Sequence, residues 1–268
     1  MPEKYVHVDG IATFVRHVGP TTLPEQPPDL SRGETVVCMH GAQWNSGLFG
    51  ALLERLGEAH SPIAFDRPGH ARSASLDALG SIAEMSAHAR GLLERWGVAK
   101  YVLLGASMGG MVALETALAA PEQVRALVLV ATAPRVNVAD AWLERQRLIT
   151  EGKARREFGR GDLAQSTPPE ILRRAFMEEI KTDPRAVYQN MLVAREFDRE
   201  NDLGRIRCPT LVLLGEEDKE TGAGGELLAS RIPNARKVVL PNCGHAQPIV
   251  QPEILADHVL AFLAELPR

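Results

Sequence analysis

Residues 103–120 read LLGASMGGMVALETALAA and place three glycines and a serine at the junction of two apolar segments. The first segment has the short apolar pattern of a buried β-strand, and the second is rich in good helix formers. Glycine weakens both kinds of element, so its concentration here needs a structural reason. Residues 105–109 fit the pattern G-x-S-x-G between a strand and a helix. We therefore expect Ser107 to lie on a sharp turn with its hydroxyl above a sheet, and the glycines to make room for it.

Outward from this junction, short apolar runs alternate with helical patterns along most of the chain. Strand-like runs occupy residues 34–41, 61–69, 100–107, 125–133, 209–218 and 235–244. They read as continuously apolar, as expected of strands that are covered on both faces of a parallel sheet. Helical patterns occupy residues 81–97, 111–122 and 251–267, and the N-terminal residues 5–18 read as a hairpin that turns at Asp9-Gly10. This alternation predicts an α/β fold with right-handed crossovers and a parallel sheet.

One stretch, residues 135–205, breaks the alternation. It is polar and helix-prone and contains no convincing apolar strand. Its positive and negative side chains almost balance, so a basic patch for anionic substrates is not supported. We expect a solvated helical insertion that covers the carboxyl edge of the sheet, where open α/β folds bind ligands.

Length and composition narrow the class of protein. The 268 residues suit one large α/β domain, and the net charge of −4 argues against nucleic-acid binding. The first residues lack the apolar core of a secretory signal, and we expect no membrane span because no apolar run is long enough. The three cysteines, an odd number, favour free thiols in a reducing compartment. These features predict a cytoplasmic protein and leave its oligomeric state open.

A serine hydroxyl is a poor nucleophile at neutral pH and needs a base that a carboxylate orients. The strand-like run at 209–218 ends in the acidic residues Glu216, Glu217 and Asp218, and His245 follows the last such run. Because the carboxyl ends of parallel strands meet at one edge, these candidates emerge on the same edge as Ser107.

With these residues in place, the sequence resembles the α/β-hydrolase superfamily, and within it the branch of small esterases, lactonases and perhydrolases that have a helical cap. Five stretches carry the resemblance in order: VVCMHGAQWNSGLF (36–49), IAFDRPGHARS (63–73), LLGASMGGMVAL (103–114), PTLVLLGEED (209–218) and NCGHAQPIVQPEILADHVLAFL (242–263). The resemblance implies a mostly parallel eight-stranded sheet with helices on both faces. It also implies a core domain of residues 1–134 and 206–268, with residues 135–205 inserted as a helical cap.

The resemblance also assigns roles to individual residues. Ser107 resembles the nucleophile, His245 the general base and Asp218 the acid that orients it. Asp218 fits best because family members usually place the acid third after the strand-ending glycine, here Gly215. Glu217 is the second choice.

An oxyanion hole of two backbone N–H groups is implied in the same way. Met108, after the nucleophile, supplies one group, and Ala42 supplies the other, with Gln43 as the second choice. His40 is expected to order this loop and His70 to shape a turn, without taking part in the chemistry.

Other conspicuous residues carry weaker signals. No histidines have the spacing of metal ligands, and we expect neither a metal nor a cofactor. Trp44 and Trp142 either line a pocket or pack in the core. Cys243 is better explained as a small buried residue than as a redox-sensitive thiol.

The expected reaction is acyl transfer from a small-molecule ester or lactone, through an acyl-enzyme on Ser107. Haloalkane dehalogenases and epoxide hydrolases of this fold carry an aspartate at the elbow, so Ser107 excludes their chemistry. The sequence HGAQW at 40–44 lacks the glycine-proline pattern of proline iminopeptidases and of meta-cleavage carbon–carbon hydrolases. The GASMGG elbow nevertheless resembles that of the carbon–carbon hydrolases, which therefore remain an alternative. A hydrolase-like ligand receptor with slow turnover is the other.

Overall fold

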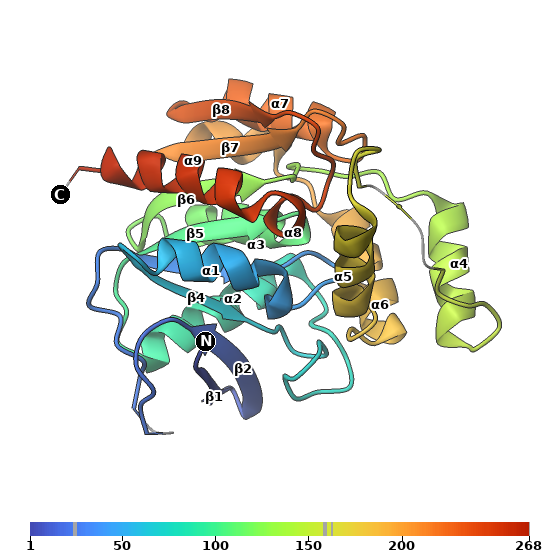
Figure 1. The fold of residues 1–268 in the computed structure, drawn as a ribbon, viewed down its shortest axis with the longest axis horizontal. Helices are drawn as coiled ribbons and strands as arrows, with labels where there is room; N and C mark the ends of the chain where they lie inside the picture. The colour runs from blue at the N-terminus through green and yellow to red at the C-terminus, as the bar shows by residue number, and fades with distance from the viewer. Residues whose placement is uncertain (24–25, 158–159, 162, 268) are drawn as a thin grey trace.

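Eight β-strands of the computed structural model, which describes residues 1–23, 26–157, 160–161 and 163–267, form a single sheet. Their order across the sheet is β1-β2-β4-β3-β5-β6-β7-β8 (Figure 1). The strands are β1 (Glu3–Val8), β2 (Ile11–His17), β3 (Thr35–Met39), β4 (Ser61–Phe65), β5 (Tyr101–Ala106), β6 (Val124–Val130), β7 (Thr210–Gly215) and β8 (Ala235–Leu240). β2 is antiparallel to both neighbours, and every pairing from β4 across to β8 is parallel. The predicted mostly parallel eight-stranded sheet is confirmed.

Helices cover both faces of this sheet, as the sequence predicts. They are α1 (Gly50–Leu56), α2 (Ile82–Arg95), α3 (Met108–Ala119), α4 (Asp140–Thr150), α5 (Pro169–Glu179), α6 (Pro184–Glu196), α7 (Gly222–Arg231), α8 (Gln247–Val250) and α9 (Pro252–Ala264), with 3-10 turns η1 (Ser46–Phe49) and η2 (Glu200–Arg205). In Figure 1, α1 and α9 lie in front of the sheet, and α2 and α3 lie behind it.

The pleat of β5 shows how one strand serves two cores. Leu103 packs into the apolar cluster that contains α2 and α3, whereas Val102 and Leu104 pack into the cluster that contains α1 and α9. Successive side chains of a strand point to opposite faces, so a continuously apolar strand needs apolar cover on both sides. The central strands have that cover.

Local backbone and side-chain geometry marks the boundaries of two elements. The hairpin between β1 and β2 turns at Asp9 (φ 48°) and Gly10 (φ 80°), the left-handed pair that a tight hairpin turn requires. Ser81 caps α2 by accepting a hydrogen bond from the Glu84 N–H at 3.1 Å. Each element thus begins where its own residues indicate.

The last strand differs from the prediction. β8 pairs with β7 alone and is the edge of the sheet, and most of its side chains are partly or fully exposed. Arg236, Lys237 and Val239 are exposed. The apolar reading of 235–244 was therefore wrong for this strand, where charged side chains suit an edge that must not pair with another chain.

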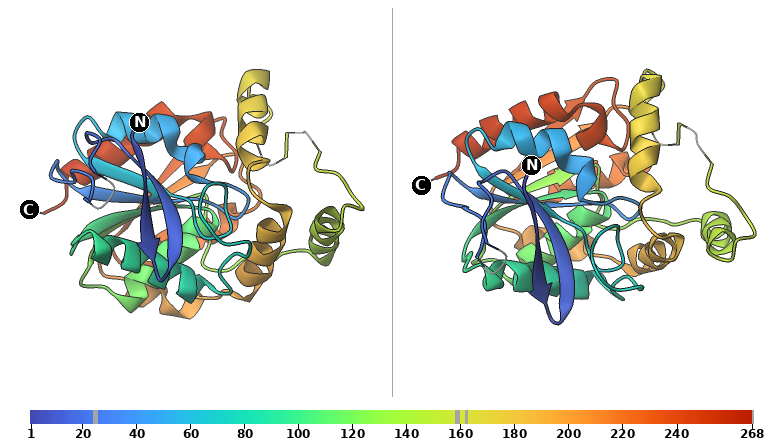
Figure 2. Two further views of the ribbon diagram at one scale, coloured as in Figure 1. Left: turned by 90° about the horizontal axis from the view of Figure 1, so that it is seen from below. Right: turned by 60° about the horizontal axis from the view of Figure 1, so that its bottom comes forward.

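Residues 135–205 contain α4, α5, α6 and η2 and no strand among their described residues. The ends of this segment come together, because Arg135 forms an isolated antiparallel bridge with Asp198 and the Arg199 N–H donates to Pro134 O at 3.0 Å. α5 and α6 lie beside one end of the sheet, and α4 lies farther out (Figure 2).

Candidate active site

Ser107 lies between the last residue of β5 and the first residue of α3, in a strained backbone conformation. Its φ of 53° and ψ of −123° place a non-glycine residue in a rarely populated region, at a cost of about 1–3 kcal/mol. Neighbouring strand residues hold it there: the Ser107 N–H donates to Val130 O at 2.9 Å, and the Thr132 hydroxyl donates to Ser107 O at 2.7 Å. This is the sharp strand-to-helix turn expected from the sequence.

The glycines around Ser107 allow backbones to approach more closely than side chains permit. A Cβ on Gly105 would lie 2.3 Å from Gly109 O, and a Cβ on Gly109 would lie 2.0 Å from Met39 O. A Cβ on Gly110 would lie 2.5 Å from the Thr132 side chain. The first two contacts are with backbone, which cannot rotate away. The glycines therefore allow α3 to pack against the ends of β3 and β5, and Ser107 sits at that contact.

Asp218 and His245 come together at the same edge. Asp218 follows β7, His245 lies between β8 and α8, and His245 Nδ1 is 3.2 Å from Asp218 Oδ2. The Asp218 carboxylate also accepts hydrogen bonds from the N–H groups of Glu220 and Thr221, at 3.0 and 3.1 Å, and from the Thr221 hydroxyl at 2.6 Å. The carboxylate is thus fixed by donors on its own loop and presents one oxygen to the imidazole.

These donors also decide the charge of Asp218. Burial by itself raises the pKa of this carboxyl, but the hydrogen bond and charge of His245, together with the Thr221 donors, outweigh burial and lower it to about 2. Asp218 is therefore ionised at neutral pH.

The other two acidic candidates point elsewhere. Glu216 Oε2 accepts a hydrogen bond from the Asn242 N–H at 3.1 Å, and Glu217 Oε2 accepts one from the Gln165 N–H at 2.9 Å. Of the three consecutive acids, only Asp218 contacts His245 among the described residues.

Ser107 and His245 are not joined in this structure. Among the described residues no hydrogen bond links the Ser107 hydroxyl to His245, and His245 Nε2 lies 3.6 Å from Glu220 Oε2. Catalytic hydrogen bonds are often long or misaligned in ligand-free enzymes and tighten with substrate. Sequence analysis did not single out Glu220, an acidic side chain that is half exposed.

The loop after β3 lies directly against Ser107. A Cβ on Gly41 would be 3.2 Å from Ser107 Cβ, so the Gly41–Ala42 peptide borders the serine. Met108 is the first residue of α3, and the first amides of a helix have no partner within it. Ala42 and Met108, the two predicted oxyanion residues, thus both adjoin Ser107. Gln43 lines the neighbouring cavity.

Buried polar residues support this loop from behind. The backbone N–H of Arg67 donates a hydrogen bond to His40 Nε2 at 3.1 Å. The imidazole proton of His40 is therefore on Nδ1, which lies 2.9 Å from Gly41 O. Burial and the Arg67 charge lower the pKa of His70 to about 3, so His70 is neutral. His70 Nε2 accepts a hydrogen bond from Asn190 Nδ2, which also donates to Ala42 O, both at 2.8 Å. Arg67 and Asn190 are functional candidates that sequence analysis missed.

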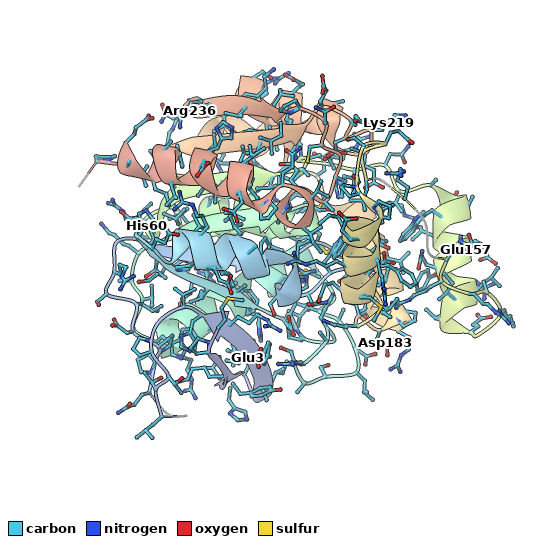
Figure 3. All side chains as sticks on the ribbon, viewed as in Figure 1. Glu3, His60, Glu157, Asp183, Lys219 and Arg236 are labelled. Atoms are coloured by element: carbon cyan, nitrogen blue, oxygen red, sulfur yellow. The ribbon has the colours of Figure 1, made fainter. Side chains whose placement is uncertain are left out.

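A cavity of about 370 Å³ opens between this edge of the sheet and the segment 135–205. His245, Trp44, Trp142 and Phe176 line it. Both tryptophans whose role the sequence left open therefore face the cavity. Glu157, beside α4 in Figure 3, also lines it and forms an ion pair of 2.9 Å with Arg145.

Three further features of the described residues concern metal ligands, membrane helices and thiols. Within the described ranges, no group of three or more His, Cys, Asp or Glu side chains is arranged to hold a metal ion. In the same part of the chain, no helix is both long and apolar enough to cross a membrane. Cys38, Cys208 and Cys243 are free thiols.

Comparison with known proteins places the chain in a family. The profile of the alpha/beta hydrolase family matches residues 36–258. A pimeloyl-(acyl-carrier protein) methyl ester esterase from Nitrosomonas europaea is 30% identical over 239 residues, which cover 82% of this chain and 92% of the esterase. The structure of a thermophilic esterase from Thermogutta terrifontis superposes with a TM-score of 0.84 at 25% identity, covering 99% of both chains. An enol-lactonase from Burkholderia xenovorans LB400 shares the fold, with a TM-score of 0.84 at 20% identity over 97% of this chain and 100% of the lactonase. The fold, the elbow and the extent of the family match agree, and the chain belongs to the alpha/beta hydrolase family.

Proposed function

We propose that this protein is a serine hydrolase that cleaves a carboxylic ester or lactone through an acyl-enzyme intermediate. The observation that carries the proposal is the strained Ser107 elbow on the same sheet edge as the hydrogen-bonded pair of His245 and Asp218. The esterases among its relatives support ester bonds as the target.

In the proposed mechanism Ser107 Oγ attacks the substrate carbonyl carbon while His245 Nε2 accepts the hydroxyl proton. The carbonyl electron pair moves onto oxygen, and the N–H groups of Ala42 and Met108 stabilise that charge. His245 then donates the proton to the leaving alcohol as the intermediate collapses to the acyl-enzyme. Water, deprotonated by His245, releases the acid and restores Ser107.

Asp218 has a defined part in this scheme. It is ionised and accepts the Nδ1 proton of His245, so Nε2 is available as the base and the imidazolium that forms is stabilised. For Nε2 to act as the base, it has to come within hydrogen-bond distance of the Ser107 hydroxyl when the substrate binds.

Residues 135–205 act in this proposal as a helical cap on the core of residues 1–134 and 206–268. The adjoining ends of the segment and the cavity beneath it support that division. A cavity of about 370 Å³ suits a small or medium acyl group or a lactone ring, and its tryptophans offer apolar contact.

The experiment compares wild type with Ser107→Ala on 4-nitrophenyl esters of increasing acyl length and on a series of lactones. We expect turnover in the wild type and a loss of roughly 10³-fold or more in kcat for Ser107→Ala. A fluorophosphonate probe is expected to label the wild type and not the variant. Ser75→Ala is the matched control, because Ser75 also has a positive φ (87°) but is exposed, in the loop between β4 and α2.

The outcomes separate the alternatives. Labelling at Ser107 without hydrolysis of any ester or lactone would contradict ester cleavage and favour carbon–carbon bond hydrolysis at the same serine. Saturable ligand binding with neither labelling nor turnover would favour a receptor.

A further inference from the structure

Arg67 is the largest fully buried side chain of the protein's described part, and it carries a charge. It lies directly after β4, in the stretch DRPG at 66–69, and is 2% exposed. Arginine is almost never buried this completely without a paired carboxylate, because its desolvation costs several kcal/mol. Such a residue needs a reason.

The guanidinium of Arg67 is directed at the loop beside Ser107. Nη2 donates to Gly41 O at 2.9 Å, and Nη1 donates to His40 O. Nη2 also lies 3.7 Å from Met108 Sδ. One side chain therefore contacts the backbone next to Ala42 and the side chain of Met108, the two residues of the proposed oxyanion hole.

No carboxylate pairs with this guanidinium among the ion pairs that the structure describes. Asp66 is adjacent in sequence, but its oxygens accept hydrogen bonds from the N–H groups of Ser46 and Arg72, at 2.7 and 3.1 Å. Burial lowers the pKa of Arg67 to about 9, partly offset by the charge of Asp66, so the side chain stays protonated at neutral pH. The Arg67 charge is held by carbonyl dipoles.

The contact with Gly41 fixes the direction of the next amide. A trans peptide is planar, and its C=O and N–H point in opposite directions. Both Arg67 Nη2 and His40 Nδ1 bind Gly41 O from the buried side. The Ala42 N–H therefore points away from Arg67, in a peptide that borders Ser107.

We propose that Arg67 is a positioning residue for catalysis, whose buried charge orients and polarises the Gly41–Ala42 peptide so that the Ala42 N–H stabilises the reaction's oxyanion. This inference rests on the proposed serine-hydrolase function. A donor on a carbonyl strengthens the hydrogen bond that the N–H of the same peptide donates. Among the described residues the guanidinium forms no ion pair with a carboxylate in the ground state, so the negative charge of the transition state is stabilised more than the neutral substrate.

The test uses Arg67→Met, which keeps apolar bulk and removes the charge and donors. With 4-nitrophenyl butyrate we expect kcat to fall by roughly 100-fold while KM changes less than about 3-fold, because oxyanion stabilisation acts on the transition state. Arg67→Lys restores the charge without the two-pronged geometry and should recover part of the loss. It also replaces Arg67→Met in the test if that variant does not fold.

Two ketone inhibitors separate positioning from a general structural role. A propyl trifluoromethyl ketone adds to Ser107: the Oγ–C bond forms, the carbonyl pair becomes an oxyanion, and the serine proton moves to His245. The matching methyl ketone binds as an unreacted carbonyl. We expect Arg67→Met to weaken the binding of the trifluoromethyl ketone by about the factor by which it lowers kcat. The binding of the methyl ketone should change little.

Arg125→Met is the matched control. Arg125 is partly buried and bonded to Glu34 at 2.7 and 3.0 Å, at the opposite end of the strands. The Arg125→Met substitution should leave kcat and both inhibition constants unchanged.

The results distinguish this proposal from the one on which it rests. A folded Arg67→Met with unchanged kcat, or an equal loss of affinity for both ketones, overturns the role of Arg67 while wild-type activity leaves the serine-hydrolase function intact. A wild type that neither turns over nor is labelled at Ser107 contradicts the proposed function itself.

Discussion

The two sides of the candidate site are built by different means: one side, here called the core wall, is the elbow around Ser107, and the other, here called the cap wall, is the proposed cap of residues 135–205. On the core side, Ser107 is held by backbone contacts, including those that the glycines at 105, 109 and 110 permit. On the other side, residues 135–205 contact the core mainly through side chains: Ala175 and Phe197 pack into its apolar clusters, and Asn45 Nδ2 donates to Glu178 O at 2.8 Å. α4 is tied to α6 by ion pairs like Arg195 with Asp140, both exposed, and such pairs contribute at most about 1 kcal/mol.

This difference indicates a division of roles. The core wall tolerates almost no change in volume, because its contacts are between backbones. The cap wall can change those side chains that line the cavity without being buried in the core, such as Arg145 and Glu157, at small cost in stability and so alter what the cavity admits. Substitutions on the two walls should therefore differ sharply in their effects.

Gly109→Ala gives the largest expected effect and challenges the core wall directly. The added Cβ would lie 2.0 Å from Met39 O, so α3 or β3 must shift, and we expect a loss of about 4 kcal/mol or more in the free energy of unfolding. Urea denaturation measures it. Gly222→Ala, at the start of α7 with nothing within 4 Å, is the control and should cost nothing. A stability for Gly109→Ala within 1 kcal/mol of the control would refute close backbone packing as the reason for the elbow glycines.

Much of the core wall could be predicted from the sequence, because its signals are local. The elbow pattern, the apolar strand runs and the Asp9-Gly10 turn each occupy a few consecutive residues and map onto β5–α3, the central strands and the β1–β2 hairpin. The same local reading was wrong for β8. The signal was present there, because Arg236 and Lys237 are charged residues of the kind that protect an edge strand, but the apolar reading of the run passed over them.

The polar contacts behind the site could not be predicted in this way. Arg67 binds Gly41 across 26 positions, and Asn190 binds Ala42 across 148. No periodicity or spacing connects such residues, since only the tertiary fold brings them together. The choice of Asp218 over Glu217 likewise came from family resemblance, because three consecutive acids have the same local pattern.

Asp218 carries the second prediction, which concerns stability at low pH. Its folded pKa of about 2 lies below the ordinary value of 3.8, so its ionised form stabilises the fold above about pH 4. That stabilisation, about 2 kcal/mol, should be lost as the pH falls from 4 toward 2. Urea midpoints measured across this range test it.

Asp218→Asn supplies the comparison for this pH dependence. Asparagine does not titrate. The stability of the Asp218→Asn variant should therefore lack the part of the decline at low pH that Asp218 contributes in the wild type. The control is Asp77→Asn, an exposed carboxylate in the loop between β4 and α2, which should retain the wild-type decline. An identical decline for Asp218→Asn and wild type would contradict the depressed pKa and the pairing with His245.

The smallest expected effect concerns a contact between the two walls. Asn190, on α6 and fully buried, donates to Ala42 O and to His70 Nε2, both at 2.8 Å. Asn190→Ala leaves both acceptors without that donor, and we expect a loss of about 1–2 kcal/mol in unfolding free energy. Because Ala42 is proposed to supply an oxyanion donor, kcat should also fall, by roughly 10-fold, more than KM rises.

Gln189→Ala, one position earlier on the same helix, separates this link from a general weakening of α6. Its side chain is only partly buried, and it should change neither stability nor kcat. If Asn190→Ala lowers stability but leaves kcat at the wild-type value, the cap supports the fold without adjusting the oxyanion loop. The two walls would then be functionally independent. If kcat falls as expected, a residue of the cap segment helps to set the geometry of a catalytic group on the core. Changes to the cap that suit it to a new substrate would then be limited by the need to keep Asn190 against Ala42.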